Sequence, residues 1–493
     1  MGSDLNSEEK RLDAVVTSAG SSSIDNGVLE DSDINVKIER RIMWKRDFIL
    51  LPTIGLLYMI MFLDRTNIAN AKIEGLEAGL DMPSNGYNTA LWIFYVPFVL
   101  AEVPSNLILN MGKIAPNYFL GGMTCILGVL GMCQGLTETY GGLLALRFLM
   151  GALEASLPAG AAYMISMYYT KREAAIRFAA FFNFALGGPF FSGLLAYAIT
   201  NLDGTGGYEG WRWIFIIEGL MTVFFGIIAL VFCPNFPEKA QRWFLKPEER
   251  DYLVAKLHAS RGLEEKGSEA EKVSTWKVLL DWRIHLFTMC FFCCDFTAAA
   301  ISSFMTSILT ELGWTSSKAQ LMTMPIWGAA IVVTFSVTWG ASKFDLRFPW
   351  VLSCICCQLV GWIIMMIWVP APGVRYAALF FMAIGSIPQM PLLMAWLSAN
   401  LRGRKYLAVG MAWMVGFGNC ANLVSSNVFI KHEAPRYFTG MVNGVTFSCL
   451  GLALVCLAAA LLAVLNRRRS QRLAGMSTAE KEQENVLSFK FHL

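Results

Sequence analysis

The chain alternates between long apolar stretches and shorter polar segments over most of its length. Each apolar stretch holds about 20 residues or more, enough for a helix to cross a hydrocarbon core of roughly 30 Å. Because backbone polar groups must be satisfied inside the bilayer, we expect each stretch to be helical. The pattern predicts twelve transmembrane helices, at 49–70, 87–111, 117–136, 141–167, 178–200, 212–233, 285–310, 319–341, 349–369, 375–398, 407–430 and 441–465.

The long polar segment in the middle of the chain separates two groups of six predicted helices. Six spans, a loop and six spans are the hydropathy pattern of two parallel repeats. The fold class predicted is therefore an all-α membrane protein with two six-helix pseudo-repeats. The predicted divisions are a disordered cytosolic tail at 1–45, a first bundle at 46–233, a cytosolic linker with an amphipathic helix at 234–283, a second bundle at 284–465 and a cytosolic tail at 466–493.

Composition supports a membrane protein and argues against several other classes. The 493 residues are 55% hydrophobic and only 16% charged, whereas soluble chains carry about a quarter charged residues. The 12 cysteines all fall inside predicted spans, and the cluster Cys354-Ile-Cys356-Cys357 has no histidine or acid beside it, which favours packing over a metal site. No Gly-Lys-Ser/Thr phosphate loop and no nucleophile cluster is present. We therefore expect no enzyme activity, cofactor, metal or nucleic-acid partner, and a monomer.

The distribution of lysine and arginine predicts the orientation, because cytosolic loops carry an excess of both. Most of the 40 Lys and Arg residues lie on the side of the predicted N-terminal tail. We therefore expect a multi-pass protein of the plasma membrane with both termini in the cytosol. Residues 37–46 are basic and amphipathic, which favours contact with anionic membrane lipids. The basic residues expected in outer loops and span mouths are Lys72, Arg212, Lys318, Arg375, Lys431 and Arg436.

Charged residues inside the fourth span mark a candidate transport pathway. Arg147 and Glu154 are seven residues apart, about two helical turns, so they project from nearly the same face, roughly 10 Å apart along the axis. Ionisable residues deep in a membrane helix are costly and usually face an aqueous cavity or a partner. An arginine makes bidentate hydrogen bonds to carboxylates. This face is therefore predicted to bind an organic anion, with the acid as a candidate proton site.

Other spans also carry ionisable residues. The first span must include Asp64 and Arg65 to reach membrane-crossing length, which favours a cavity-facing pair. Glu102 in the second span is either a proton site or a structural partner for the next cytosolic turn. Glu218 in the sixth span is expected to form a structural pair with a neighbouring helix. Asp295 is the lone buried acid predicted in the second half.

Neutral polar residues in the spans are candidates for hydrogen bonding to a substrate. They include Asn67 beside the Asp-Arg pair, Asn183 in the fifth span, and Asn419 and Asn422, which share a face of the eleventh span by their spacing. Gln389 lies between two prolines of the tenth span. Such residues also serve as hydrogen-bonding contacts between membrane helices, and the sequence leaves both roles open.

Three sequence stretches resemble a known family of transporters. They are Leu63-Asp-Arg-Thr-Asn-Ile68, Arg147-Phe-Leu-Met-Gly-Ala-Leu-Glu154 and Gly210-Trp-Arg-Trp-Ile-Phe-Ile-Ile-Glu-Gly219. With the twelve-span plan, they resemble the major facilitator superfamily, and within it the anion:cation symporter family in its fungal allantoate/nicotinate permease branch. The resemblance covers about 46–465.

The resemblance implies roles for several of these residues. In the family, the counterparts of Arg65 and Arg147 bind the substrate carboxylate, and those of Asp64 and Glu154 carry the coupling proton. Bacterial relatives use a second-span tyrosine whose position falls on Phe98 here, with Tyr95 about one turn away. The gating motif between the second and third spans lacks its usual acid. The function implied is proton-coupled symport of a small organic anion by alternating access.

Two other functions stay open on the sequence. Gly188-Pro189-x-x-Ser192-Gly193 approaches the fifth-span Gly-Pro-x-x-Gly-Gly motif of proton-driven exporters, which would fit export of a fungal metabolite by proton antiport. A receptor of transporter fold that does not transport is the third possibility. The intact acidic and basic residues of the first and fourth spans argue against it.

Overall fold

The computed structural model describes residues 37–110, 114–199, 202–265, 275–344, 346–401 and 404–474, and these ranges contain helices and no strand. A helical stretch over 37–45 leads into the first membrane helix. The elements up to the linker are η1 (Arg46–Leu50), α3 (Leu51–Ala71), η2 (Lys72–Leu76), α4 (Glu77–Gly79), α5 (Gly86–Asn110), α6 (Pro116–Leu136), α7 (Tyr140–Glu154), α8 (Ser156–Tyr168), α9 (Lys171–Ile199) and α10 (Gly210–Phe232). The linker and second half hold α11 (Pro247–Glu265), α12 (Thr275–Leu279), α13 (Trp282–Glu311), α14 (Ser316–Phe344), α15 (Phe348–Ile367), α16 (Pro372–Ser386), α17 (Gln389–Asn400), α18 (Arg404–Gly418), α19 (Ala421–Val428) and α20 (Phe438–Ala474).

Ten helical stretches of the described chain are long and apolar enough to cross a membrane. The two other spans expected from the sequence, 87–111 and 407–430, fall on α5 and on α18 with α19. The predicted all-α membrane fold is therefore confirmed.

Local sequence signals explain where several helices begin. Thr139 caps α7 because its hydroxyl accepts a hydrogen bond from the Gly142 amide at 3.2 Å. Asp281 caps α13 in the same way, accepting from the Arg283 amide at 2.9 Å. Pro116 opens α6 at a position where a missing amide proton costs nothing. Two of these signals thus mark the starts of α7 and α13, which carry Arg147, Glu154 and Asp295.

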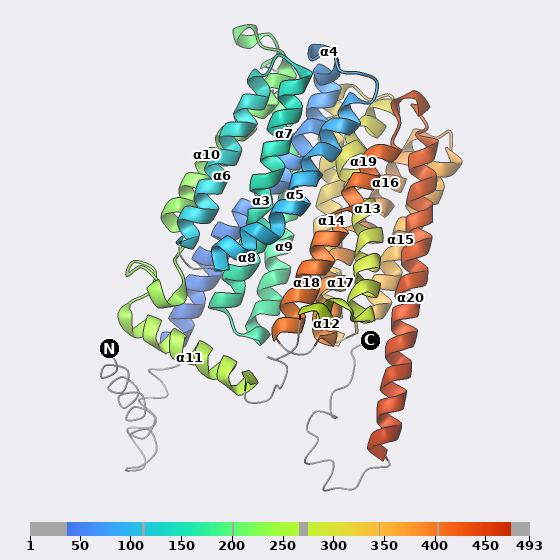
Figure 1. Ribbon diagram of the computed structural model, residues 1–493. Coiled ribbons are helices and arrows are strands. Elements are labelled where there is room, and N and C mark those ends of the chain that lie inside the picture. The colour runs from blue at the N-terminus through green and yellow to red at the C-terminus, as the bar shows by residue number, and fades with distance from the viewer. Residues whose placement is uncertain are drawn as a thin grey trace, which may run out of the picture.

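The helices form two groups that lie side by side (Figure 1). Helices α3–α10 occupy one side of the molecule and α13–α20 the other. The linker helices α11 and α12 lie at one end, and α4 lies at the opposite end. We refer to these as the α11 end and the α4 end.

The two groups share an apolar core toward the α4 end. One buried cluster joins both groups and includes Tyr87 of α5 and Phe304 of α13. Away from it, each group has a core of its own, represented by Phe181 in the first and Trp396 in the second. Close van der Waals packing of buried side chains, together with hydrogen bonds, holds membrane helices together. The groups are therefore joined at the α4 end and have separate cores toward the α11 end.

Hydrogen bonds reinforce this closure at the α4 end. Tyr87 Oη donates to Ser303 O at 2.8 Å, and Asn88 Nδ2 donates to Phe429 O at 3.0 Å. Gln320 Nε2 donates to Glu74 Oε1 at 3.1 Å. Each bond joins a helix of the first group to one of the second.

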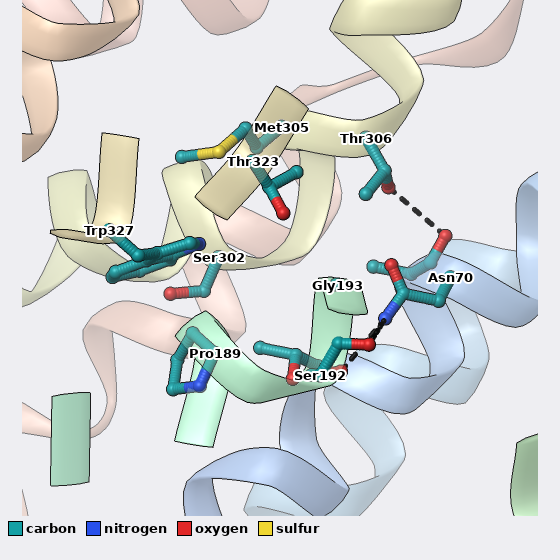
Figure 2. A pocket seen from close by; sticks show the side chains of 11 residues that line it. Asn70, Pro189, Ser192, Gly193, Ser302, Met305, Thr306, Thr323 and Trp327 are labelled. Carbon is teal, nitrogen blue, oxygen red and sulfur yellow. Dashed lines mark hydrogen bonds between the residues drawn. The ribbon is translucent and has the colours of Figure 1, made fainter. Parts of the chain in front are cut away.

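A small pocket lies in the same region, where α3, α9, α13 and α14 meet (Figure 2). Thr306 Oγ1 donates to Ala69 O at 3.1 Å across it, and Asn70 Nδ2 donates to Ser192 Oγ at 2.8 Å along its floor. Gly193 lines the pocket, and a Cβ there would lie 2.7 Å from Gln320 O of α14. The close approach of α9 to α14 thus depends on a residue without a side chain.

Glycines also bring the charged segments together. A Cβ at Gly151 of α7 would overlap the carbonyl oxygen of Phe94 on α5. A Cβ at Gly188 of α9 would lie 2.7 Å from the Leu63 amide nitrogen on α3. Small residues are common where membrane helices approach closely. These two contacts bring α7 against α5, and α9 against α3 next to its Asp-Arg pair.

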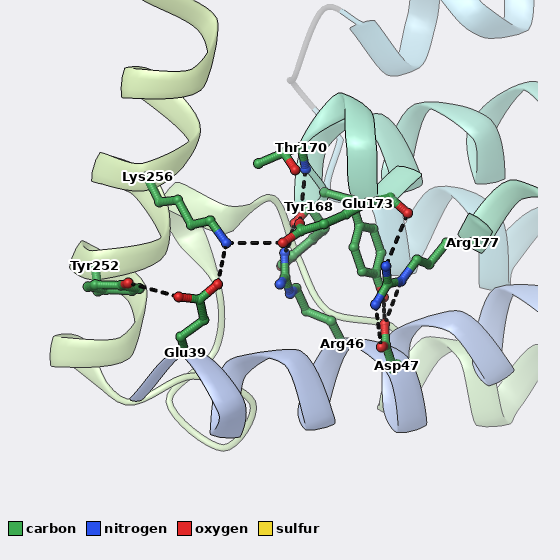
Figure 3. A network of polar contacts seen from close by, with 10 residues as sticks. Glu39, Arg46, Asp47, Tyr168, Thr170, Glu173, Arg177, Tyr252 and Lys256 are labelled. Atoms are coloured by element: carbon green, nitrogen blue, oxygen red, sulfur yellow. Dashed lines mark hydrogen bonds and ion pairs between the residues drawn. The ribbon is translucent and has the colours of Figure 1, made fainter. Parts of the chain in front are cut away.

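A polar network fastens α11 to the first group (Figure 3). Lys256 Nζ of α11 lies 2.7 Å from Glu39 Oε1 and 3.0 Å from Glu173 Oε1 at the start of α9. Arg46 Nη1 reaches the other oxygen of Glu173 at 3.3 Å, and Lys45 Nζ pairs with Glu249 of α11 at 2.6 Å. Ion pairs therefore join the linker helix to the segment before α3 and to the start of α9.

Candidate functional site

The polar segment of α3 is buried inside the first group. Asp64 is 3% exposed, and both of its carboxyl oxygens lie near Thr222 Oγ1 of α10, at 3.3 and 3.2 Å. Asn67 Nδ2 donates to Asp64 Oδ1 at 3.3 Å, while Asn67 Oδ1 is buried without a partner. The carboxyl group predicted to carry a proton is thus held by neutral donors.

Arg65 pairs with the acid of the fourth span. Its Nε donates to Glu154 Oε1 at 2.5 Å. The guanidinium carbon lies 4.7 Å from the Phe98 ring centroid and 5.7 Å from that of Tyr95. Aromatic faces attract cations at these distances. Phe98, at the position of the family's second-span tyrosine, and Tyr95 therefore both lie beside Arg65.

Arg147 is buried without a hydrogen-bonding partner for part of its guanidinium. The residue is 4% exposed, and neither Nε nor Nη2 has an acceptor. Its guanidinium carbon lies 5.8 Å from the centroid of Phe215 on α10. Leaving buried charged donors unpaired is expensive, so the arrangement is incomplete without an acceptor.

The helix that carries Arg147 and Glu154 is locally distorted directly after the acid. The element α7 ends at Glu154 and α8 begins at Ser156, with a turn at Ala155. Pro158 lies four residues after Glu154 and has no amide proton to donate to the Glu154 carbonyl. Ala155 keeps right-handed helical backbone angles and its amide donates to Gly151 O at 3.3 Å, so the helix is distorted locally and continues into α8.

Two further acids lie in the first group. Glu102 Oε2 of α5 is buried without a partner, and a Cβ added at Gly416 of α18 would lie 3.2 Å from it. Glu102 therefore faces the second group of helices. Both carboxyl oxygens of Glu218 on α10 are buried without a partner. The structural pair expected for Glu218 is not formed by the described residues.

The second group contributes an acid and an amide. Asn422 Nδ2 of α19 donates to Asp295 Oδ2 of α13 at 2.6 Å. Asn419 lies in the turn between α18 and α19, and its Nδ2 donates to Val415 O of α18 at 2.9 Å. Of the two asparagines predicted to share a face, only Asn422 is bonded to a side chain on another helix.

The remaining polar candidates lie elsewhere. Gln389 Nε2 donates to Gln358 Oε1 at 2.8 Å, within the second group. Asn183 Oδ1 of α9 is buried without a partner. Thr222 and Phe98 contact the charged residues but were not among the predicted site residues. The family resemblance had pointed to the position of Phe98. A threonine in an apolar helix carries no sequence signal of its own, so only packing reveals the role of Thr222.

The charges of the site are unequal in number. Five acidic residues, at positions 64, 102, 154, 218 and 295, are buried in the membrane helices together with Arg65 and Arg147. A buried carboxylate without a partner is costly to ionise, so proton binding lowers the free energy of such a group. No cluster of His, Cys, Asp or Glu in the described part of the chain could hold a metal ion. The arrangement is suited to binding an anion and exchanging protons.

Comparisons with known proteins agree on the type of molecule. The family model described as Major Facilitator Superfamily matches residues 54–426. An uncharacterised transporter of Schizosaccharomyces pombe is 30% identical over 482 residues, covering 96% of this chain and 92% of its own. The high-affinity nicotinic acid transporter of Saccharomyces cerevisiae is 27% identical, covering 84% of this chain and 76% of its own.

A solved structure has the same fold. The inward-facing, occupied form of a bacterial homologue of the human lysosomal transporter Spinster matches with a TM-score of 0.63. It covers 83% of this chain and 96% of its own, at 16% identity. At that identity the likeness concerns the fold alone.

Proposed function

The chain belongs to the major facilitator superfamily, and from this premise we propose that it is a secondary transporter carrying a small organic anion together with protons. As a member of that superfamily it is a multi-pass membrane transporter and not an enzyme. The substrate class, the coupling ion and the direction of transport are our proposal. So is membership of the anion:cation symporter family, in the fungal allantoate/nicotinate permease branch.

The observation that carries the proposal is the incomplete hydrogen bonding of Arg147. A buried guanidinium with two unpaired nitrogens needs an acceptor, and a substrate carboxylate supplies two oxygens in matching geometry. Arg65 is already engaged by Glu154 and can join the same anion only when that pair loosens. The nicotinic acid transporter of yeast, whose name states a carboxylate substrate, supports this class.

Proton coupling follows from the balance of charges. An anion entering a site that already has more acids than arginines adds a negative charge to a low-dielectric region. Protonation of Glu154 would remove one such charge and free Arg65 at the same time. We propose Glu154, Asp64 and Glu102 as proton-coupling residues, and Arg65, Arg147, Asn67, Tyr95, Asn183 and Asn419 as substrate contacts.

The proposal also covers the orientation of the chain in the membrane and its division into domains. With the positively charged segments inside, the α11 end is cytosolic and the α4 end faces outward. The joined core at the α4 end then corresponds to a state closed to the outside. We propose that 46–233 and 284–465 are the two bundles that rock about the site, linked by 234–283, in a monomer of the plasma membrane with cytosolic tails at 1–45 and 466–493.

Export of a metabolite is the second candidate, because Gly188 and Gly193 match part of an exporter motif. In this structure the two glycines allow close helix contacts, to Leu63 and to Gln320, which accounts for them without an export function. We therefore prefer uptake.

Transport by reconstituted protein tests the proposal. Vesicles holding the purified full-length chain should accumulate labelled nicotinate or a related carboxylate when protons are driven inward, and their lumen should acidify as substrate enters. Vesicles without protein are the control. Efflux of a neutral metabolite driven by inward protons, with no carboxylate uptake, would instead support the exporter.

A further inference from the structure

The helical stretch that contains α3 is longer than a membrane requires. It runs from Lys37 to Gly79 and contains 43 residues, about 64 Å at 1.5 Å per residue. A hydrocarbon core is roughly 30 Å thick. With the span predicted at 49–70 inside the bilayer, residues 37–48 lie at its α11 end, at the level where the polar headgroups begin.

Residues 37–48 have two distinct faces. One face packs against the protein: Ile42 and Arg46 are each 1% exposed, and Glu39 and Lys45 form ion pairs with α11 (Figure 3). The other face is exposed, and its members follow one another at helical spacings of three and four. We call it the basic-aromatic face, and it consists of Lys37, Arg40, Arg41, Trp44 and Phe48.

The three basic residues of this face are not neutralised by the protein. Lys37, Arg40 and Arg41 are exposed, and none of them forms an ion pair with another residue that the structure describes. Together with Trp44 and Lys45 they line a shallow hollow. Lys45 is already engaged, since its Nζ lies 2.6 Å from Glu249 of α11. The hollow therefore offers three uncompensated positive charges to an anion.

The two aromatic residues follow the charges toward the membrane. Trp44 is 59% exposed and Phe48 is 61% exposed, and their rings stack with centroids 4.0 Å apart. Tryptophan is typical of the membrane–water interface, and basic segments beside a membrane helix attract anionic lipids. Along the helix toward α3, the order is thus cations, an interfacial ring and an apolar ring. This order matches the headgroup, the interface and the acyl chains of a lipid.

We propose that the basic-aromatic face binds an anionic phospholipid of the cytosolic leaflet, with the lipid phosphate against the basic residues and an acyl chain along Trp44 and Phe48. Charge complementarity identifies the headgroup, and the exposed rings beside a membrane helix favour a lipid over a soluble anion. The inference uses the proposed cytosolic position of the α11 end. It does not depend on the transported substrate or on proton coupling, and its test measures binding and not transport.

Lipid binding to the wild-type protein tests this directly. The purified full-length chain, in a neutral detergent, is titrated with phosphatidylserine or with phosphatidylcholine of the same acyl chains, and bound lipid is counted by native mass spectrometry. Phosphatidylserine should bind roughly tenfold more tightly or better, since each nearby Lys or Arg contributes about fivefold. Equal affinity for the two lipids overturns the inference.

A soluble probe separates the lipid from its headgroup. Glycerophosphoserine carries the phosphate and serine of phosphatidylserine without acyl chains, so it should bind at least about tenfold more weakly because it cannot cover the two rings. Equally tight binding of glycerophosphoserine would assign the hollow to a soluble anion and overturn the lipid assignment. Replacing both rings, in Trp44→Ala with Phe48→Ala, should weaken the binding of both lipids several-fold and leave the preference for phosphatidylserine unchanged.

A charge-removing variant identifies the residues responsible. Replacing all three basic residues with glutamine should weaken phosphatidylserine binding by roughly tenfold or more and abolish the preference over phosphatidylcholine. The three substitutions are Lys37→Gln, Arg40→Gln and Arg41→Gln.

The matched control removes three charges from the same end of the molecule. The last turns of α20 lie at the α11 end and carry exposed arginines, but residues 464–474 contain no aromatic side chain. The control substitutions are Arg467→Gln, Arg468→Gln and Arg472→Gln, and this variant should keep the wild-type affinity and preference. Equal losses in the two triple variants would reduce the effect to a general attraction by positive charge and overturn the site. If the first triple variant is not recovered as folded protein, the wild-type comparison of the two lipids and glycerophosphoserine still decides.

Discussion

Arg65 on α3 donates from Nε to Oε1 of Glu154 on α7 over 2.5 Å. Arg65 Nη2 and Glu154 Oε2 remain buried without partners, so the pair is only partly satisfied. Arg147 lies two turns before Glu154 on the same helix, while Arg65 of α3 is already bound to the acid. Protonation of Glu154 would weaken its bond to Arg65 and make a second guanidinium available to an anion. A single proton could thus change the affinity of the site for substrate.

Lysine at position 147 should strongly impair transport without preventing membrane insertion. Arg147→Lys keeps the positive charge but loses the planar pair of donors that a carboxylate requires. Losing one charge-assisted bond costs about 1.5–3 kcal/mol, so kcat/KM should fall by roughly ten- to a hundredfold or more. Labelled-carboxylate uptake, normalised to protein in the vesicles, measures it.

The matched control is Arg212→Lys at the α4 end. Arg212 Nη1 donates to the backbone carbonyls of Gly135 and Thr137, a task that an ammonium group can also perform. Near-normal KM is expected for that variant. Normal uptake by Arg147→Lys would return Arg147 to a structural role.

The helical spans were predictable because the length of an apolar run shows directly whether a helix can cross the membrane. The predicted spans 212–233 and 285–310 correspond to α10 and α13, with ends that differ by a few residues. The interruptions were not predicted. A one-residue turn at Ala155, or the break at Asn419 and Cys420, leaves mean hydropathy unchanged. Pro158 was the local signal at Ala155, because a proline has no amide proton to donate to the Glu154 carbonyl four residues earlier.

The candidate site was predictable residue by residue but not contact by contact. Helical periodicity correctly places Arg147 and Glu154 on one buried side of α7, because it concerns a single helix. It cannot relate α3 to α7, so the bond from Arg65 to Glu154 is seen only once these helices are packed together. Periodicity likewise could not show that Asn422 bonds Asp295 of another helix while Asn419 bonds Val415 O of α18.

A methyl group at position 193 should push the α4 end open. A Cβ on Gly193 would crowd Thr323 and lie 2.7 Å from Gln320 O, both on α14 of the other half. Overpacking costs about 1–3 kcal/mol, which would shift the balance between closed and open states by roughly 5- to 100-fold. Spin labels at the exposed residues Ala78 and His432 should therefore move apart in Gly193→Ala.

Gly187→Ala is the control on the same helix. Its Cβ would meet the flexible side chain of Met59 at 3.0 Å, on α3 of its own half. We expect the label distance of that variant to equal the wild-type value. An unchanged distance in Gly193→Ala as well would mean that α9 and α14 accommodate the methyl group without separating.

The ion pairs that hold α11 should persist from mildly acidic to alkaline pH. Partial burial opposes ionisation of Glu173, but Arg46 and Lys256 outweigh it and hold its pKa below the ordinary value. Burial likewise opposes the charge on Lys256, but Glu39 and Glu173 raise its pKa. The stabilising effect of Glu173 on the docking of α11 is thus lost only as pH falls through its lowered pKa. The stabilising effect of Lys256 is lost only as pH rises through its raised pKa.

The exchange rate of the backbone amides of 247–265, corrected for intrinsic rates, should consequently be independent of pH around neutrality. Lys256→Ala should raise it several-fold, since partly exposed pairs contribute about 0.2–1 kcal/mol each. Arg250→Ala removes a pair with the exposed Asp251 on the same helix and should change little. A strong pH dependence near neutrality would mean that other groups control the docking of α11.

The last prediction separates substrate binding from proton coupling. Glu154→Gln mimics a permanently protonated acid, and its amide oxygen can still accept from Arg65 Nε. The variant should bind substrate and exchange internal for external substrate, because exchange needs no net proton movement. Concentrative uptake should fail, because the empty carrier cannot release a proton before it returns. Asp64→Asn is the matched control, since Asp64 is equally buried but is held by neutral donors, Thr222 and Asn67. Counterflow, which reports exchange, and pH-driven uptake, which reports coupling, are measured side by side in both variants. Full pH-driven accumulation by Glu154→Gln would exclude it as the coupling site and make Asp64 the leading candidate.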